Sequence, residues 1–275
     1  MKIRIGHSPD PDDAFLFYGM TQGKIPLGDL TVEHFLEGIE ELNQRAVRGE
    51  MEMTAISLHA YAYCADRYLV LTAGASVGEG YGPVVVARRP MAPEEIPVGA
   101  VAVPGRLTTA SLLLQLAVGK VQAKMMPFDQ ILESVRQDQV ASGVLIHEGQ
   151  ITYAEHGLHK VLDLGEWWEK ETGLPVPLGI NVVRRDLGEG AKNLARLFKQ
   201  SLDYSFAHRR EALEYSMQYG RGLDYALTDR FVGMYVNRWA VDCRPDGAKA
   251  MQLLLDRAAE AGLIPAKVRL EFVEA

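Results

Sequence analysis

The densest group of ionisable side chains in the sequence lies close to its start. Two residues, His7 and Ser8, are followed by two prolines and three aspartates (Asp10, Asp12 and Asp13), directly before an apolar segment typical of a helix. Prolines restrict the backbone, and the first turn of a helix leaves N–H groups unpaired, so this turn is suited to bind a ligand rigidly. The pattern is equally typical of a capped helix start, because aspartate is favoured there. Both interpretations apply to Asp12 and Asp13, whereas Asp10 stands too early in the sequence for a cap.

A second candidate site follows Gly105, where a predicted turn leads into Thr108 and Thr109 and then into an apolar segment over 110–118. Hydroxyl and backbone N–H groups at the start of a helix suit a carboxylate or a phosphate. Either threonine alone is also explained as an N-cap. The segment lacks the glycine spacing of a dinucleotide-binding loop and of a Walker loop.

A histidine, His147, follows the apolar segment 143–146, which we predict to be a strand. At the carboxyl end of a strand, histidine is well placed to act as a general base near neutral pH. The alternative is a structural histidine held by hydrogen bonds. The other histidines lack metal-ligand spacing, so we predict no metal site. Ser57 lacks the Gly-x-Ser-x-Gly context of a serine nucleophile.

Segments typical of strands and helices alternate along the chain, which predicts an α/β protein with parallel sheet as the default. Two β-branched segments, 84–88 and 178–185, resemble each other and bracket the middle of the chain. We expect them to connect a larger lobe, formed by 1–88 and 186–275, with a smaller inserted lobe formed by 89–185. Ligands bind in the clefts between such lobes and at the carboxyl ends of parallel strands.

Composition excludes several classes of protein. With 48% hydrophobic and 24% charged residues the chain is typical of a globular protein, and its net charge of −7 without a basic block argues against a nucleic-acid partner. The start has no apolar signal-peptide core and no segment has 18 consecutive apolar residues, so we expect a cytoplasmic protein without membrane contact. Cys64 and Cys243 lie far apart and are predicted to be buried thiols. The sequence does not indicate an oligomeric state.

Four segments together resemble the 1,4-dihydroxy-6-naphthoate synthases of the futalosine route to menaquinone. They are SPDPDDAFLFY at 8–18, PGRLTTA at 104–110, IHE at 146–148 with TY at 152–153, and DLGEWW at 163–168 with TGLPVPLG at 172–179. The segments occur in the order found in that family and are spread over most of the chain. Four motifs in one order are far more specific than any one of them.

The resemblance implies a fold like the two-lobed (type II) periplasmic solute-binding proteins, with a cleft between the lobes. It implies an enzyme without a cofactor, a lyase that converts cyclic dehypoxanthinyl futalosine, an anionic small molecule, to 1,4-dihydroxy-6-naphthoate by carbon–carbon cleavage and aromatisation. Position 147 matches the family's catalytic histidine, which removes a proton so that the sugar-derived fragment departs. The implied substrate-binding positions are Ser8, Asp10, Asp13, Ser57, Thr108 and Thr109.

The first motif departs from the form we associate with this family, which has Cys, Asn and Thr where this chain has Asp10, Asp12 and Ala14. Two acids therefore stand beside the expected anionic substrate, which indicates either a divergent synthase or a relative acting on a related molecule. The alternatives from other classes are a solute-binding protein for a small anion and the sister enzyme chorismate dehydratase, which shares the fold. The first motif resembles the synthases and not that sister enzyme.

Overall fold

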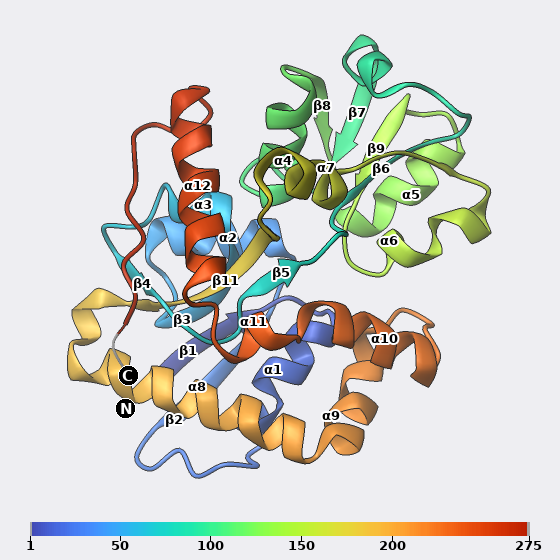
Figure 1. Ribbon diagram of the computed structural model, residues 1–275. Coiled ribbons are helices and arrows are strands. Elements are labelled where there is room, and N and C mark those ends of the chain that lie inside the picture. The colour runs from blue at the N-terminus through green and yellow to red at the C-terminus, as the bar shows by residue number, and fades with distance from the viewer. Residues whose placement is uncertain (1, 274–275) are drawn as a thin grey trace.

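The computed structural model describes residues 2–273, which fold into two lobes, each built on one β-sheet (Figure 1). The first sheet has the order β2-β1-β3-β11-β4, with β5 also paired to β11, and the second has the order β10-β6-β9-β7-β8. The strands of the first sheet are β1 (Lys2–His7), β2 (Thr31–Leu36), β3 (Met53–Ser57), β4 (Tyr68–Val70), β5 (Ser76–Gly78) and β11 (Val176–Arg184). Those of the second are β6 (Val84–Ala87), β7 (Ala100–Val103), β8 (Gln122–Met125), β9 (Ser142–Leu145) and β10 (His159–Asp163). The predicted α/β class is confirmed.

Helices surround both sheets. In the larger lobe they are α1 (Pro11–Thr21), α2 (Ile39–Arg48), α3 (Leu58–Tyr61), α8 (Glu189–Ala207), α9 (Arg209–Ser216), α10 (Tyr225–Tyr235), α11 (Arg238–Val241) and α12 (Asp246–Glu260). In the smaller lobe they are α4 (Thr109–Val118), α5 (Phe128–Arg136), α6 (Gly149–Thr152) and α7 (Leu164–Thr172). Short 3-10 helices span Pro93–Val98, Tyr153–His156, Arg185–Leu187 and Met217–Tyr219.

Alternating side chains bury both faces of each sheet. In the first sheet, Ile5 of β1 packs in an apolar cluster with α1 and α8, whereas Ile56 of β3 packs with α3 and α12 on the other face. In the second sheet, Val84 and Val86 belong to a cluster with α5, whereas Val85 belongs to one with α4. Successive residues of a strand point to opposite faces, so such uniformly apolar segments are typical of a sheet covered on both sides.

Parallel strands form only part of each sheet: β2, β1 and β3 in the first, and β8, β7 and β9 in the second. The other strands pair antiparallel, because β11 runs opposite to β3, β4 and β5, and β6 runs opposite to β9 and β10. The expectation of parallel sheet is therefore wrong for these strands. The physical reason is that the chain reaches β6 and β11 from the other lobe. Each of these two strands therefore runs opposite to its neighbours in the sheet that it joins.

The chain passes between the lobes at two segments that contain glycine and proline, 79–83 and 173–175. The β-branched strand after each segment, expected to be the crossing itself, lies wholly in one sheet: β6 in the second and β11 in the first. β-Branched residues favour the pleated interior of a sheet, whereas glycine and proline favour irregular connections. We therefore propose lobe limits near residues 82 and 175 in place of 88 and 185.

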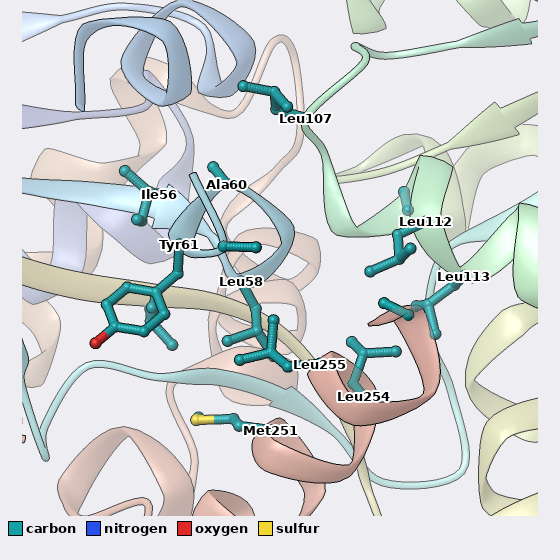
Figure 2. Close-up of a cluster of buried hydrophobic side chains, with 14 of the residues drawn as sticks. Ile56, Leu58, Ala60, Tyr61, Leu107, Leu112, Leu113, Met251, Leu254 and Leu255 are labelled. Carbon is teal, nitrogen blue, oxygen red and sulfur yellow. The ribbon is translucent and has the colours of Figure 1, made fainter. Parts of the chain in front are cut away.

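One edge of the interface between the lobes is a continuous apolar cluster. Figure 2 shows Leu112 and Leu113 of α4 lying near Leu254 and Leu255 of α12, with Leu58 of α3 beside them. All of these side chains are fully buried. The smaller lobe is thus attached to the larger one by packed side chains as well as by the two crossing segments.

Both thiols of the chain, Cys64 and Cys243, are free and buried, which confirms the prediction made for them. None of the helices within residues 2–273 is long and apolar enough to cross a lipid bilayer.

We expect Leu112→Ala to lower the free energy of unfolding by about 2–5 kcal/mol, because it leaves a cavity in the cluster between α4 and α12. Val98→Ala is the control, since this side chain is 79% exposed and should change stability by less than about 0.5 kcal/mol. Urea denaturation followed by circular dichroism measures both variants. Equal stabilities for the two variants would contradict the assigned packing.

Candidate active site

A cavity of about 690 Å³, its mouth included, lies between the two lobes. The larger lobe lines it with residues from the turn after β1, from β3 and from β11, and the smaller lobe with the start of α4 and the turn after β9.

The first motif forms a closed turn at one end of the cavity. Both the backbone N–H and the hydroxyl of Ser8 donate to Oδ2 of Asp13, at 3.0 and 2.6 Å. Helix α1 begins at Pro11, ahead of the apolar segment, because the fixed φ of proline suits the first helical position. This start places Asp10 at the cap position, yet its side chain makes no capping hydrogen bond.

Two carboxyl groups of this turn line the cavity in an environment that favours their neutral form. Burial raises the pKa of Asp13 to about 6, against the hydrogen bonds from Ser8. Burial, together with the charges of Asp13 and Asp10, raises the pKa of Asp12 well above its usual range. Within residues 2–273, Oδ1 of Asp12 has no hydrogen-bond partner. A protonated Asp12 therefore offers the cavity a neutral hydrogen-bonding group.

The imidazole of His147 faces the carboxylate of Asp10 across the boundary between the lobes. Its Nε2 atom lies 3.1 Å from Oδ2 of Asp10, a side chain that is fully buried. These two atoms are not aligned for a hydrogen bond, and neither has a hydrogen-bond partner among the described residues. The backbone of His147 has φ of 54°, in the left-handed region that residues with a side chain rarely adopt. Such backbone strain is concentrated at functional sites, so it indicates a function for this residue.

Behind Asp10 lies Arg221, in the turn before α10. Its guanidinium donates to Oδ1 of Asp10, to the Pro9 carbonyl at 2.8 Å, and to both carboxylate oxygens of Glu148, at 2.5 and 3.2 Å. It also lies over the ring of Phe128, 4.6 Å from the ring centre. The imidazole of His147 contacts the same phenyl ring edge-on, with the two ring centres 4.7 Å apart.

The start of α4 forms the opposite end of the cavity. Thr108 is the N-cap, and its hydroxyl oxygen accepts from the N–H of Ser111 at 3.3 Å. The hydroxyl of Thr109 donates to the carbonyl of Leu178 at 2.6 Å. Because both hydroxyls are already engaged, an anion here would bind mainly to the unpaired N–H groups of the first helical turn. Nearby, Asn43 fixes Ser57 through hydrogen bonds of 2.8 and 3.1 Å.

The structure brings most of the predicted residues to the cavity wall: Ser8, Asp13, Ser57, Thr108, Thr109 and His147. Asp10 is not part of that wall, because it lies behind His147 with its oxygens turned to His147 and Arg221. The wall includes two carboxyl groups and one imidazole but, within the described part of the chain, no lysine or arginine.

Sequence reasoning missed three further residues of the site, Arg221, Gln150 and Tyr235. The side-chain amide of Gln150 and the hydroxyl of Tyr235 are hydrogen bonded at 2.6 Å, and both side chains line the cavity. The signal for Gln150 is its place in the sequence, three residues after His147. Nothing in the sequence around Arg221 or Tyr235 indicated a role, because their partners come from distant segments. Residues 2–273 hold no cluster of three or more His, Cys, Asp or Glu side chains arranged for a metal ion.

A family model described as menaquinone biosynthesis matches residues 3–260 of this chain. The chain belongs to that family. It is 41% identical, over 273 residues, to a 1,4-dihydroxy-6-naphthoate synthase of Thermus thermophilus, which covers 98% of this chain and 99% of the relative. The resemblance expected from the four motifs is thereby confirmed, and the family places the protein in menaquinone biosynthesis.

Solved structures extend this comparison to the fold. A crystal structure of a protein from Archaeoglobus fulgidus is 48% identical and matches this member of the family with a TM-score of 0.91, covering 96% of this chain and 98% of that one. The alkanesulfonate-binding protein of Xanthomonas axonopodis matches with a TM-score of 0.70 at 14% identity, covering 98% and 96%. The predicted fold, like that of the two-lobed periplasmic solute-binding proteins, is confirmed.

We expect Asp13→Asn to become more stable relative to the wild type as the pH rises. The pKa of Asp13 in the folded protein, about 6, lies above the usual 3.8, so ionising this carboxyl disfavours the folded state. The gain should be absent below a pH of about 4 and reach about 2–3 kcal/mol above a pH of about 6. Urea denaturation across this pH range measures it.

Asp186→Asn is the control for this titration. Asp186 is exposed, and its hydrogen bonds with Arg184 lower its pKa, so its removal should bring no gain as the pH rises. A stability difference between Asp13→Asn and the wild type that stays constant with pH would show that Asp13 ionises normally.

Proposed function

We propose that this protein catalyses the reaction of the 1,4-dihydroxy-6-naphthoate synthases, in which cyclic dehypoxanthinyl futalosine is converted to 1,4-dihydroxy-6-naphthoate. In this lyase reaction a carbon–carbon bond is cleaved and a ring becomes aromatic. The observation that carries the proposal is the position of His147, on the wall of the cavity between the lobes with a buried carboxylate at one ring nitrogen. Family membership and the identity to the Thermus thermophilus synthase supply the reaction.

His147 is the general base in this proposal. Because Nε2 is turned to Asp10, Nδ1 is the ring nitrogen left for a ligand. A carboxylate at one nitrogen stabilises the imidazolium that forms when the other nitrogen takes a proton. In the proposed reaction that proton comes from the substrate, and its removal lets the sugar-derived fragment leave.

The remaining wall suits a planar ligand that carries a carboxylate. Ile39, Ile56 and Leu178 supply apolar surface for a ring system. The first turn of α4, after Thr108, supplies N–H groups and the positive end of the helix dipole for the carboxylate. We propose this binding mode because no lysine or arginine of the described chain lines the cavity.

The two acids of the first motif are compatible with an anionic substrate in this arrangement. Asp12 faces the cavity in an environment that favours its neutral form, and Asp10 lies outside the wall with its charge paired to Arg221. Neither needs to present a full negative charge to the substrate. We therefore favour a synthase that acts on the family's substrate over a relative with a changed one.

We expect the purified protein to form 1,4-dihydroxy-6-naphthoate from cyclic dehypoxanthinyl futalosine, and His147→Ala to lower the rate at least about 100-fold, since general base catalysis contributes that much. Mass spectrometry measures the product, and circular dichroism checks that the variant folds. His156→Ala, at an exposed histidine of the same lobe, should keep wild-type activity.

Product formation at an unchanged rate by His147→Ala would show that His147 is not the general base. Binding without turnover by the wild type would point to a related substrate. Neither binding nor turnover would favour the alternative of a solute-binding protein for another small anion.

A further inference from the structure

The polar contacts around His147 connect the two lobes. His147 and Glu148 follow β9 of the second sheet, whereas Asp10 follows β1 of the first sheet. Arg221 precedes α10, which packs with α9 against α1 in the larger lobe. The contacts of His147 with Asp10 and of Glu148 with Arg221 therefore exist only when the lobes lie as close together as they do here.

Arg221 fixes the orientation of the Asp10 carboxylate. It holds Oδ1 by a hydrogen bond and the backbone next to Asp10 by another, to the carbonyl of Pro9. This leaves Oδ2 3.1 Å from Nε2 of His147 and without a hydrogen-bond partner in the described chain. A buried carboxylate oxygen without a partner costs free energy, so an N–H group at Nε2 is favoured there. A protonated Nε2 leaves the other ring nitrogen, Nδ1, free to accept a proton.

Stability alone does not explain this arrangement. A buried ion pair contributes little to folding compared with apolar side chains of the same volume, because both charges lose their hydration. The group also carries two residues in the left-handed backbone region, His147 at φ 54° and Arg221 at φ 47°. Both features cost stability, which is expected where geometry serves a function.

We propose that Asp10 is a positioning residue that orients and polarises His147 across the cleft, and that Arg221 makes this contact depend on closure of the two lobes. The proposal rests on the proposed function, in which His147 is the base. It assigns Asp10 to the histidine rather than to the substrate. A base assembled from both lobes is complete only while the lobes are closed on each other, as they are here.

The charges that face the imidazole determine what a substitution at Asp10 does. Asp10 and Asp13 face it from the larger lobe, and Glu148 is its neighbour in the chain. Arg221 is the cation of the group, and it is hydrogen bonded to Asp10 and Glu148. Asp10→Asn therefore removes the carboxylate in contact with Nε2 while Arg221 and the other acids remain, which disfavours the imidazolium.

The test is a nuclear magnetic resonance titration of ¹⁵N-histidine-labelled protein without substrate, with His147→Ala used to assign the signal. In Asp10→Asn we expect the Nε2–H tautomer of His147 to lose its predominance, because the carboxylate oxygen that favours a proton on Nε2 is gone. Asp186→Asn, which removes an exposed carboxylate paired with Arg184, should leave the His147 signal unchanged. An unchanged tautomer in folded Asp10→Asn would overturn the proposal.

Kinetics then connect the titration to turnover. In Asp10→Asn we expect kcat to fall about 10- to 100-fold, because the base loses the carboxylate that orients it. KM should change little, because Asp10 does not touch the cavity. A change confined to KM would instead make Asp10 a substrate-binding residue. The titration of Asp10→Asn could respond as expected while His147→Ala remains active. That result would support the contact between Asp10 and His147 but contradict the role of His147 as the base.

Arg221→Gln tests the dependence on closure and also covers the case in which Asp10→Asn does not fold. Small-angle X-ray scattering of the unliganded protein should show a larger radius of gyration in Arg221→Gln than in the wild type. The titration should show the same loss of the Nε2–H tautomer as in Asp10→Asn. Arg210→Gln is the control, because Arg210 forms an exposed ion pair with Glu214 within α9 of the larger lobe. Wild-type scattering and tautomer in Arg221→Gln would overturn the role given to the arginine.

Discussion

A carboxylate without access to water is the constraint on which the arrangement of this site depends. Asp10 is fully buried, so its charge must be met by groups of the protein, and Arg221 and His147 are the two that reach it. One comes from the larger lobe and the other from the smaller. The two crossing segments, the strained turn after β9 and the early start of α1 all contribute to bringing these three side chains together.

The same constraint shapes the charge of the cavity. Arg221 is held by carboxylates and is not available to a ligand at the wall, which leaves α4 to provide the positive potential for an anion. Asp12 does not cancel that potential as long as burial keeps its neutral form favoured. An anionic ligand can thus be bound by dipoles and N–H groups, in the way that helix starts bind anions generally.

The parts of this structure that local patterns specify could be predicted from the sequence. Thr108 caps α4 and His147 follows a buried strand, because capping and burial depend on neighbouring residues. The role of Asp10 could not be predicted, since Arg221 lies 211 residues away and stands between glycines that indicate only a turn. The crossing segments that we propose differ from those expected from the sequence for a related reason. β-Branched residues indicate a strand but not the sheet that it joins, which depends on contacts across the whole chain.

The apolar cluster between α4 and α12 differs in kind from the ion pairs at the other side of the cleft. Dissolved salt screens partly exposed charges, such as those of Arg221 and Glu148, whereas it does not weaken contacts between leucines. Ionic strength therefore acts on one edge of the interface between the lobes and leaves the opposite edge in place. A change in ionic strength can therefore alter how easily a ligand enters the cleft, while the apolar cluster between α4 and α12 keeps the two lobes attached.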